Sequence, residues 1–393
     1  MEPEPVSAQP APIRRHFLLA AGGTGGHMIP AHALAEELMR RGHKVALVTD
    51  ARGAKIPGLF AGVDTHELPA GRLGGGVLGW IKAARGIWAG RRAAKALIRD
   101  FEPAVVVGFG GYPALPTLLA ALSLKVPTAL HEQNAVLGRV NRLLAGRVDA
   151  LATAYRQVDR LPATVDPIVV GNPVRAEVLG LRDQPYPPLS EDGIFRLLVT
   201  GGSQGASVLS TVVPDALGML PVVLRQRLQV TQQCRPEDIE KVRTRYAELD
   251  IPADLATYLG DLPERLGWSH LFVGRSGAST IAELTAAGRP AILVPLPSAM
   301  DDHQTANARE MAATGGARSI PQARFTALEL AKQMQKLALE PGALENAARR
   351  AREAGYPNAT ADLADLVERL AGPTPEAIPL TTTPPRNFKE ALA

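Results

Sequence analysis

One local pattern constrains the fold of this chain more than any other, and it occurs twice. Residues 17–21 are all apolar and predict a buried strand, and four of the next five residues are glycines. A helix is predicted over residues 31–41. The pattern returns where a second predicted strand, residues 195–200, runs into the glycine turn at residues 201–206. A strand, a glycine turn and a helix N-terminus form an anion site, because free N–H groups and the helix dipole point at the ligand.

The first glycine turn does not match the common nucleotide-binding fingerprints. Gly23 and Gly25 fit the first two positions of G-x-G-x-x-G, but Met28 stands at the last one. No G-K-[ST] sequence follows, so the turn is not a Walker loop either. The turn therefore indicates binding of a phosphate or diphosphate, with His27 beside it as a candidate acid or base.

Short apolar runs that alternate with helical patterns predict an α/β protein. Such alternation favours a parallel sheet with helices on both faces. The second half of the chain repeats it, so we expect two Rossmann-like domains that face a cleft. Two predicted strands of the first half end in the loops at residues 108–113 and 131–134. Ligands of such sheets lie beyond the carboxyl ends of the strands, so we expect these loops to share a cleft with the first glycine turn.

Changes in composition divide the chain into segments. The N-terminus is acidic and proline-rich, unlike a signal peptide, and no apolar run approaches the roughly 20 residues of a membrane span, so we expect a cytoplasmic protein. A stretch rich in Pro, Gly and charge predicts a linker between the domains. The expected segments are a disordered tail (1–14), an N-terminal domain (15–172), a linker (173–192), a C-terminal domain (193–358), a helix that packs back on the N-terminal domain (359–371) and a second disordered tail (372–393).

Basic charge is concentrated in the N-terminal half. Residues 1–172 contain 20 Lys and Arg against 13 Asp and Glu, whereas the remaining residues contain 23 against 26. Residues 70–99 contain seven basic residues and no acidic one, interleaved with Trp80, Ile81, Trp88 and other apolar residues. This pattern is typical of a helix at an anionic membrane surface. A helix whose apolar stripe packs on the core has the same pattern, so both interpretations stay open.

Residues 274–283 place polar side chains at the turn from a predicted strand into a helix. The helix N-terminus offers N–H groups to a phosphate, and Arg275 could add positive charge. Glu283 lies about a turn and a half further on, where its carboxylate can accept hydrogen bonds from a vicinal diol such as that of a ribose. The alternative is a capped helix with an exposed glutamate.

Residues 294–307 run from a predicted strand through a loop into a polar helix start with Gln304 and Asn307. Amide side chains both donate and accept hydrogen bonds, so they can recognise sugar hydroxyls. The alternative is ordinary helix capping by a preceding aspartate. A metal site is not expected, because Cys234 is the single cysteine and His303 has no second ligand at a suitable spacing.

Seven motifs follow one another in an order that resembles one enzyme family. They are GGTGGH, GFGGYP, HEQN, GNPVR, GGSQGA, RSGAST with a later Glu, and DHQ with a later Asn. From about residue 16 to residue 371 the chain resembles the MurG family of glycosyltransferases, in glycosyltransferase family 28. The resemblance implies a GT-B fold and an inverting transfer of N-acetylglucosamine from UDP-N-acetylglucosamine to the muramoyl 4-hydroxyl of lipid I (undecaprenyl-diphospho-MurNAc-pentapeptide). The product would be lipid II, a precursor in peptidoglycan synthesis.

The resemblance also implies roles for individual residues, with the donor in the C-terminal domain and the acceptor in the N-terminal domain. His27 is the implied catalytic base, Glu283 would hold the ribose, and Gln304 would read the 4-hydroxyl of the donor sugar. Leu259 and Arg275 would flank the uracil. The implied donor-binding residues are Thr24, Gly25, Gly26, Asn134, Arg175, Ser203, Leu259, Arg275, Ala278, Ser279, Thr280, Ile281, Ala282, Glu283 and Gln304. The implied acceptor-binding residues are Gly22, Gly23, Gly110, Gly111, Tyr112 and Asn141.

The resemblance implies no cofactor and no metal. It implies a peripheral enzyme on the cytoplasmic face of the bacterial inner membrane, with an anionic membrane surface and other cell-wall synthesis proteins as partners. Nucleic acid is not expected as a partner, because aromatic residues make up only 4% of the chain and no recognised module is present. The chain departs from the family pattern where His303 replaces a second glutamine, and where residues 297–300 lengthen the preceding loop by one residue.

Two other functions compete with the glycosyltransferase. A nucleotide-sugar epimerase shares the paired Rossmann-like architecture, but it acts on the free UDP-sugar and needs no lipid acceptor. A non-catalytic protein that binds a sugar nucleotide would keep its behaviour after substitution of His27.

Overall fold

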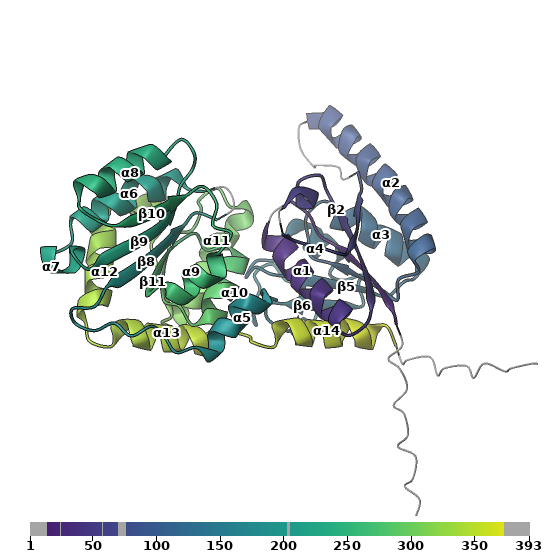
Figure 1. The fold of residues 1–393 in the computed structure, drawn as a ribbon. Coiled ribbons are helices and arrows are strands. Elements are labelled where there is room, and N and C mark those ends of the chain that lie inside the picture. Colours follow the sequence, from purple (N-terminus) through teal and green to yellow (C-terminus); the bar gives the residue numbers. More distant parts are fainter. Residues whose placement is uncertain (1–13, 24, 57, 70–75, 203–204, 373–393) are drawn as a thin grey trace, which may run out of the picture.

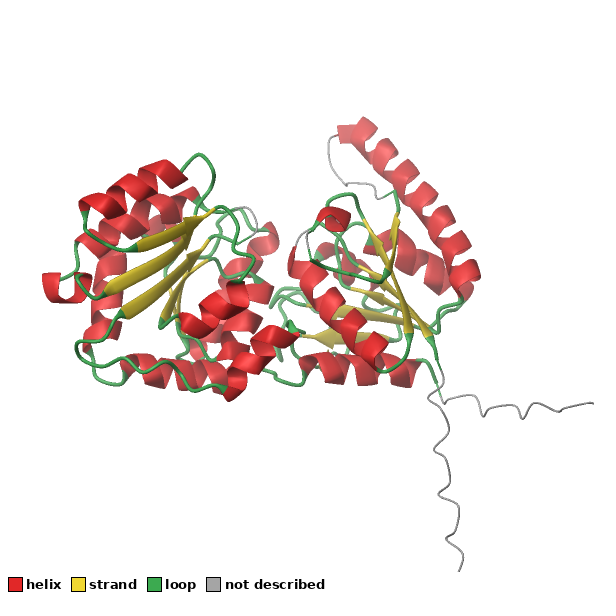
Figure 2. Cartoon of the chain, viewed as in Figure 1, coloured by secondary structure: helices red, strands yellow, loops and turns green. Residues whose placement is uncertain are grey.

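Two α/β domains lie side by side in the computed structural model of the chain (Figure 1). Helices cover the strands of both domains (Figure 2). The structure describes residues 14–23, 25–56, 58–69, 76–202 and 205–372, and for residues 76–83 it describes the backbone alone. Thr24, Ser203 and nearly all of the two expected tails lie outside the described residues.

The N-terminal domain contains a seven-stranded parallel sheet with the order β3-β2-β1-β4-β5-β6-β7. Its strands are β1 His16–Ala20, β2 Lys44–Thr49, β3 Asp64–Glu67, β4 Val105–Gly108, β5 Thr128–Glu132, β6 Ala150–Thr153 and β7 Ile168–Val169. Its helices are α1 Gly25–Arg40, α2 Gly76–Phe101, α3 Ala114–Leu124 and α4 Arg139–Leu144, with a short 3-10 turn at Gly53–Lys55.

The C-terminal domain repeats this topology in a six-stranded parallel sheet with the order β10-β9-β8-β11-β12-β13. Its strands are β8 Phe195–Thr200, β9 Leu228–Gln233, β10 Ala253–Ala256, β11 Leu271–Gly274, β12 Ala291–Leu293 and β13 Ala317–Ser319. Its helices are α6 Ser207–Gly218, α7 Val222–Arg225, α8 Ile239–Glu248, α9 Leu262–Trp268, α10 Ala278–Ala287, α11 His303–Ala313, α12 Ala327–Leu339 and α13 Ala343–Ala354. None of the helices in the described part of the chain is both long and apolar enough to cross a membrane.

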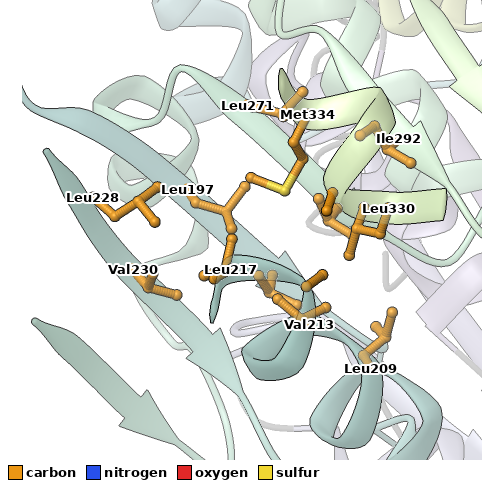
Figure 3. Packing of buried hydrophobic residues seen from close by; sticks show 14 of the residues in the cluster. Leu197, Leu209, Val213, Leu217, Leu228, Val230, Leu271, Ile292, Leu330 and Met334 are labelled. Carbon is orange, nitrogen blue, oxygen red and sulfur yellow. The ribbon is translucent and has the colours of Figure 1, made fainter. Parts of the chain in front are cut away.

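Helices cover both faces of each sheet (Figure 2), and alternate side chains of a strand point to opposite sides and so enter different core clusters. In β1, Phe17 and Leu19 pack in one core cluster, whereas Leu18 packs in the cluster on the other face. The C-terminal domain follows the same plan, and Figure 3 shows Leu197 of β8 close to Met334 of α12. Burying each of these large side chains stabilises the fold by about 1.5–3 kcal/mol.

Helix α1 begins at Gly25, six residues before the start expected from the sequence. Pro30 lies inside the helix, where its missing N–H removes one backbone hydrogen bond. Glycine and proline are poor helix formers, so the sequence favoured a later start. As a consequence His27 lies in the first turn of the helix instead of in a loop before it.

The last described helix, α14 (Ala359–Leu370), returns to the N-terminal domain and packs against α1 (Figure 1). Leu363 and Val367 are fully buried in the same core cluster as Phe17. Glu368 adds a hydrogen bond to His43, with 2.7 Å between Oε1 and Nε2. The C-terminal end of the described chain is therefore part of the N-terminal domain.

The stretch expected to be a linker is partly folded. Helix α5 (Ala176–Gly180) and the 3-10 turn Leu181–Asp183 follow the GNPVR motif. Val174, Val178 and Leu181 are buried in a core cluster of the C-terminal domain. This part of the connection is therefore packed against the C-terminal domain and is not a free tether.

Candidate active site

The two glycine turns follow β1 and β8, the strands at which the order of each sheet reverses. Ligands of open α/β sheets bind at this switch point, beyond the carboxyl ends of the strands. The two domains meet on this side, because α1 contacts α10. Asn307 of α11 links them further: its Nδ2 donates to Asn134 Oδ1 at 3.0 Å and to the carbonyl oxygen of Ser276 at 3.3 Å. The structure thus brings together the HEQN, RSGAST and DHQ loops.

The first glycine turn interlocks with the GFGGYP loop. A Cβ atom on Gly22 would lie 2.4 Å from Pro113 Cγ, and one on Gly111 would lie 2.8 Å from the Gly22 carbonyl oxygen. Gly110 and Gly111 have φ angles of 93° and 78°, a region that favours glycine. Side chains at these positions would force the loops apart, so the glycines allow a close approach of two backbones.

A cavity of about 420 Å³ lies beside this pair of loops. Its lining includes Tyr112 of the GFGGYP loop, Asp50, Arg52 and Glu67. Asp50 connects the cavity to the glycine turn, because its Oδ1 accepts a hydrogen bond from Gly23 N at 3.2 Å. The expected acceptor residues Gly22, Gly23, Gly110, Gly111 and Tyr112 therefore lie together in two adjoining loops.

His27 is half-buried in the first turn of α1, where it continues a chain of hydrogen bonds. Its Nδ1 lies 2.9 Å from Gln133 Oε1. Gln133 Nε2 in turn lies 3.0 Å from His131 Nδ1, and His131 Nε2 lies 2.9 Å from the carbonyl oxygen of Gly171. Burial lowers the pKa of His131 to about 4, and the neighbouring His27 adds to the shift. His131 is therefore a neutral ring at physiological pH.

Glu132 stabilises the loop that surrounds this chain of hydrogen bonds. Its carboxylate is 1% exposed and accepts four hydrogen bonds. Oε1 accepts from the backbone and side chain of Asn134, and Oε2 accepts from Gly138 N and from Asn141 Nδ2 at 2.9 Å. The Oδ1 atom of Asn141 is buried and has no hydrogen-bond partner among the described residues. A Cβ atom on Gly110 would lie 3.7 Å from this oxygen and 3.1 Å from His27 Cε1, so Asn141 Oδ1 and His27 flank the same glycine.

The N-terminus of α10 belongs to the C-terminal domain, where the family resemblance places the donor. Gly277 caps the helix with extended backbone, and the first turn holds the expected residues Ala278, Ser279 and Thr280. The hydroxyl of Ser279 is buried and has no partner among the described residues. A buried hydroxyl at a helix start, where N–H groups are free, is suited to an anionic oxygen.

Glu283 is 3% exposed and is not the solvated helix residue that the alternative interpretation required. Its Oε1 accepts two hydrogen bonds from Arg175, at 2.8 Å from NH2 and 3.1 Å from Nε. Burial raises the pKa of Glu283, and the charge of Arg175 opposes this shift. The pair fixes the orientation of the carboxylate. Ile281 and Ala282, from the same turn, lie in and against the core cluster of this domain.

The charge of Arg275 suggested contact with a phosphate, but its guanidinium is bonded within its own domain. Its guanidinium donates to the carbonyl oxygens of Val294 and Pro295 and to Gln322 Oε1. Burial lowers its pKa, and Arg235 adds to the shift. Arg275 thus holds the loop that follows β12. Leu259 is half-buried against the core cluster that contains Ile281.

Gln304 is anchored at the start of α11. Its Oε1 accepts from Leu296 N at 3.0 Å, and its backbone carbonyl accepts from the Ser276 hydroxyl at 2.8 Å. Its side-chain NH2 group has no hydrogen-bond partner among the residues that the structure describes. His303 Nδ1 lies 2.8 Å from the carbonyl oxygen of Met300, so this ring contacts its own loop.

Four buried side chains complete the arrangement: His131, Glu132 and Gln133, which the sequence did not single out, and Asn307, for which the sequence predicted contact with sugar hydroxyls. All four are at most 1% exposed. The first three belong to the HEQN motif, so the motif marked the place, but only the structure shows which side chain turns toward which partner. Among the residues that the structure describes, no group of three or more His, Cys, Asp and Glu side chains could hold a metal ion.

Comparison with known proteins places both domains in one family. The model of the glycosyltransferase family 28 N-terminal domain matches residues 17–153, and the model of its C-terminal domain matches residues 196–370. The chain belongs to glycosyltransferase family 28. A family member from Zymomonas mobilis, named UDP-N-acetylglucosamine--N-acetylmuramyl-(pentapeptide) pyrophosphoryl-undecaprenol N-acetylglucosamine transferase, is 68% identical over 92% of this chain and 94% of its own length.

Solved structures confirm the fold that the family implies. MurG from Acinetobacter baumannii is 29% identical and superposes with a TM-score of 0.72, over 90% of this chain and 99% of its own. A UDP-GlcNAc 2-epimerase from Neisseria meningitidis, 13% identical, superposes with a TM-score of 0.62 over 90% of this chain and 100% of its own. The second likeness shows the fold alone. The prediction of a GT-B fold with two Rossmann-like domains is confirmed.

Proposed function

We propose that this chain transfers N-acetylglucosamine from UDP-N-acetylglucosamine to the muramoyl 4-hydroxyl of lipid I, with inversion, and so forms lipid II. The observation that carries the proposal is the 68% identity, across both domains, to a relative named for this transfer. The geometry supports it, because two different anion-binding surfaces, one from each domain, lie on the side where the domains meet.

The donor binds to the C-terminal domain. The start of α10 and the Ser279 hydroxyl face the diphosphate, helped by the glycine turn that contains Ser203. Glu283, oriented by Arg175, accepts hydrogen bonds from the ribose diol. Gln304 donates its free NH2 group to a hydroxyl of the sugar. Backbone N–H groups and hydroxyls stabilise the departing UDP without a metal ion, since they are already oriented toward the charge that develops.

The acceptor binds to the N-terminal domain. The interlocked glycine loops bind its diphosphate, and the unpartnered Oδ1 of Asn141 accepts a hydrogen bond from the sugar beside His27. His27 takes the proton from the 4-hydroxyl as this oxygen attacks the anomeric carbon. A single displacement on the face opposite UDP inverts the α configuration of the donor to β.

The acceptor is a membrane lipid, and helix α2 is the surface that we propose contacts the anionic cytoplasmic leaflet. The helix has no acidic residue before Asp100. Its C-terminal part packs on α3, with Ala94 and Ile98 buried. Its start projects beyond the sheet (Figure 1), and Trp88 is 66% exposed. The C-terminal part of α2 thus supports the interpretation of a helix packed on the core, and the rest supports membrane contact.

The decisive experiment measures UDP release from UDP-N-acetylglucosamine with and without a soluble lipid I analogue. The proposal predicts that release requires the acceptor, and that His27→Ala lowers turnover by about 100-fold or more. Release that does not depend on the acceptor, or formation of a free epimerised sugar nucleotide, contradicts the proposal and supports an epimerase. A variant that retains full turnover contradicts the role of His27.

A further inference from the structure

We infer that Gln133, held in place by His131, is a positioning residue that fixes His27 in the tautomer with its proton on Nδ1. This inference rests on the proposed role of His27 as the base. It concerns which nitrogen of the ring can take a proton, because a neutral imidazole has one donor nitrogen and one acceptor nitrogen. The hydrogen bond made by one nitrogen decides the state of the other.

Two backbone carbonyls determine the direction of the whole chain of hydrogen bonds, because a carbonyl oxygen can only accept. The His131 carbonyl oxygen lies 2.9 Å from one terminal atom of the Gln133 side chain, so this atom must be the amide nitrogen. The Gly171 carbonyl oxygen lies 2.9 Å from His131 Nε2, so this nitrogen must carry a hydrogen. The first conclusion does not depend on which way the amide was oriented beforehand.

The remaining hydrogens follow from these two. His131 is neutral and protonated on Nε2, so its Nδ1 accepts the second N–H of the Gln133 amide, at 3.0 Å. The Gln133 oxygen then faces His27 Nδ1 at 2.9 Å and must receive a hydrogen from it. In neutral His27 the lone pair therefore lies on Nε2, which is the nitrogen left to act as the base.

The opposite orientation of the Gln133 amide fails at two points. Its oxygen would face the His131 carbonyl oxygen, which offers no hydrogen. It would also require a hydrogen on His131 Nδ1 in addition to the one on Nε2, and so a charged ring that is 0% exposed. Isolated charge in such a setting is strongly unfavourable.

The surroundings keep these groups in place. His131 and Gln133 are 0% and 1% exposed, and the His131 ring packs against Phe109 with 5.6 Å between ring centres. His27 lies close to the backbone of Gly110, since a Cβ atom built there would be 3.1 Å from His27 Cε1. Gly171, the last group in the chain, begins the GNPVR motif and packs against Tyr356 before α14. The hydrogen bonds that fix the tautomer of His27 thus end at Gly171, next to the segment that connects the two domains.

A histidine without such a partner prefers its proton on Nε2, so loss of the Gln133 oxygen should reverse the tautomer. The test is nitrogen-15 NMR of histidine-labelled full-length protein in mildly alkaline buffer, where unperturbed histidine is neutral. In the wild type, His27 should show a protonated Nδ1 and an unprotonated Nε2. In Gln133→Met, which keeps the length of the side chain, the proton should move to Nε2.

The same variant should lose about 10- to 100-fold in kcat, with KM for the donor unchanged within twofold, because the base is impaired while donor binding is not. Gln232→Met is a matched control: Gln232 is a fully buried glutamine in the other domain, and its Oε1 accepts from Tyr246. This control should leave the His27 tautomer unchanged.

A wild-type His27 protonated on Nε2 overturns the inference, as does a folded Gln133→Met protein with unchanged tautomer and kcat. The wild-type spectrum gives this answer even if the variant does not fold. The outcome is distinct from failure of the proposed base, because His27→Ala tests the base by turnover, whereas the spectrum is read without any reaction.

Discussion

At the scale of single residues, the account depends on buried polar groups whose partners are incomplete. Glu283 and Arg175 form a buried pair, and Asn141 Oδ1 and Ser279 Oγ have no partner among the described residues. Buried polar groups in proteins are nearly always hydrogen-bonded, and these two atoms belong to residues expected at the acceptor and donor sites, so we expect the ligands to supply their missing partners. Glu283 and Asn141 were predicted from the sequence through the family resemblance. Gln133 and Glu132 were not, because a motif shows that residues are near a site but not how their side chains turn.

Glu283→Ala should weaken UDP binding about tenfold or more, since the ribose diol loses a charged acceptor and Arg175 loses its partner. Calorimetry of the wild type and the variant, each with UDP and with UDP lacking both ribose hydroxyls, forms a double-mutant cycle. The cycle separates the loss of the contact with the diol from the loss of the partner of Arg175. The analogue should bind the wild type and the variant with similar affinity. If the variant weakens UDP and the analogue equally, Glu283 does not contact the diol.

His131 should make the stability of the protein sensitive to acid. The unfolded chain protonates this ring near its ordinary pKa of 6.5, whereas the folded protein does so only near pH 4. Its contribution is thus fully present above pH 6.5 and is lost as the pH falls toward 4. Denaturant unfolding of His131→Gln between these limits should show a pH slope that is smaller by up to about 1.4 kcal/mol per pH unit.

An equal slope in the variant and the wild type would show that His131 does not titrate in this way. His270, whose pKa burial also lowers to about 4, should account for part of the slope that remains in the variant.

At the scale of helices and strands, the sequence predicted central strands well and edge strands poorly. The strand β8 was predicted at its observed bounds because it is mostly apolar, as is typical of central strands in a parallel sheet. The edge strand β3 (Asp64–Glu67) has the composition of a loop and is mostly exposed, so periodicity could not reveal it. The start of α1 was missed because it contains two glycines and a proline, which are poor helix formers.

The prediction at this scale concerns the binding of helix α2 to a membrane surface. Trp88→Ser should reduce co-sedimentation with anionic vesicles several-fold, because an exposed tryptophan next to basic residues inserts at the interface. Val223→Ser in α7 is the matched control, since Val223 is 71% exposed on the other domain and its loss should not change binding. Equal binding by all three proteins would assign α2 to core packing alone.

At the scale of the whole molecule, one loop of the C-terminal domain meets basic residues of the N-terminal domain. Asp301 Oδ1 lies 2.6 Å from Arg160 NH1, and its Oδ2 lies 3.7 Å and 3.8 Å from Arg139 and Arg142. Asp301 and Asp302 have φ angles of 55° and 54°, in the left-handed region that non-glycine residues rarely adopt. The sequence predicted that the domains face each other, but it could not predict this contact, because charge pairs between distant segments leave no local pattern.

Asp301→Asn should loosen the arrangement of the domains, since it removes the charge that faces three arginines. Small-angle X-ray scattering at low salt should give a larger radius of gyration for the variant, and added salt should reduce the difference by screening. Asp302→Asn is the control, because the Asp302 carboxylate accepts only from Thr305 of its own domain among the described residues. Identical scattering from both variants would mean that Asp301 does not hold the domains together.

The most direct test of the central claim is the structure of the product. UDP-N-acetylglucosamine and a soluble lipid I analogue are incubated with the protein, and the new glycosidic bond is identified by NMR. The account predicts one N-acetylglucosamine attached to the 4-hydroxyl of the muramoyl sugar in the β configuration. An α linkage, attachment at another hydroxyl, or an altered sugar nucleotide with the acceptor unchanged would contradict it.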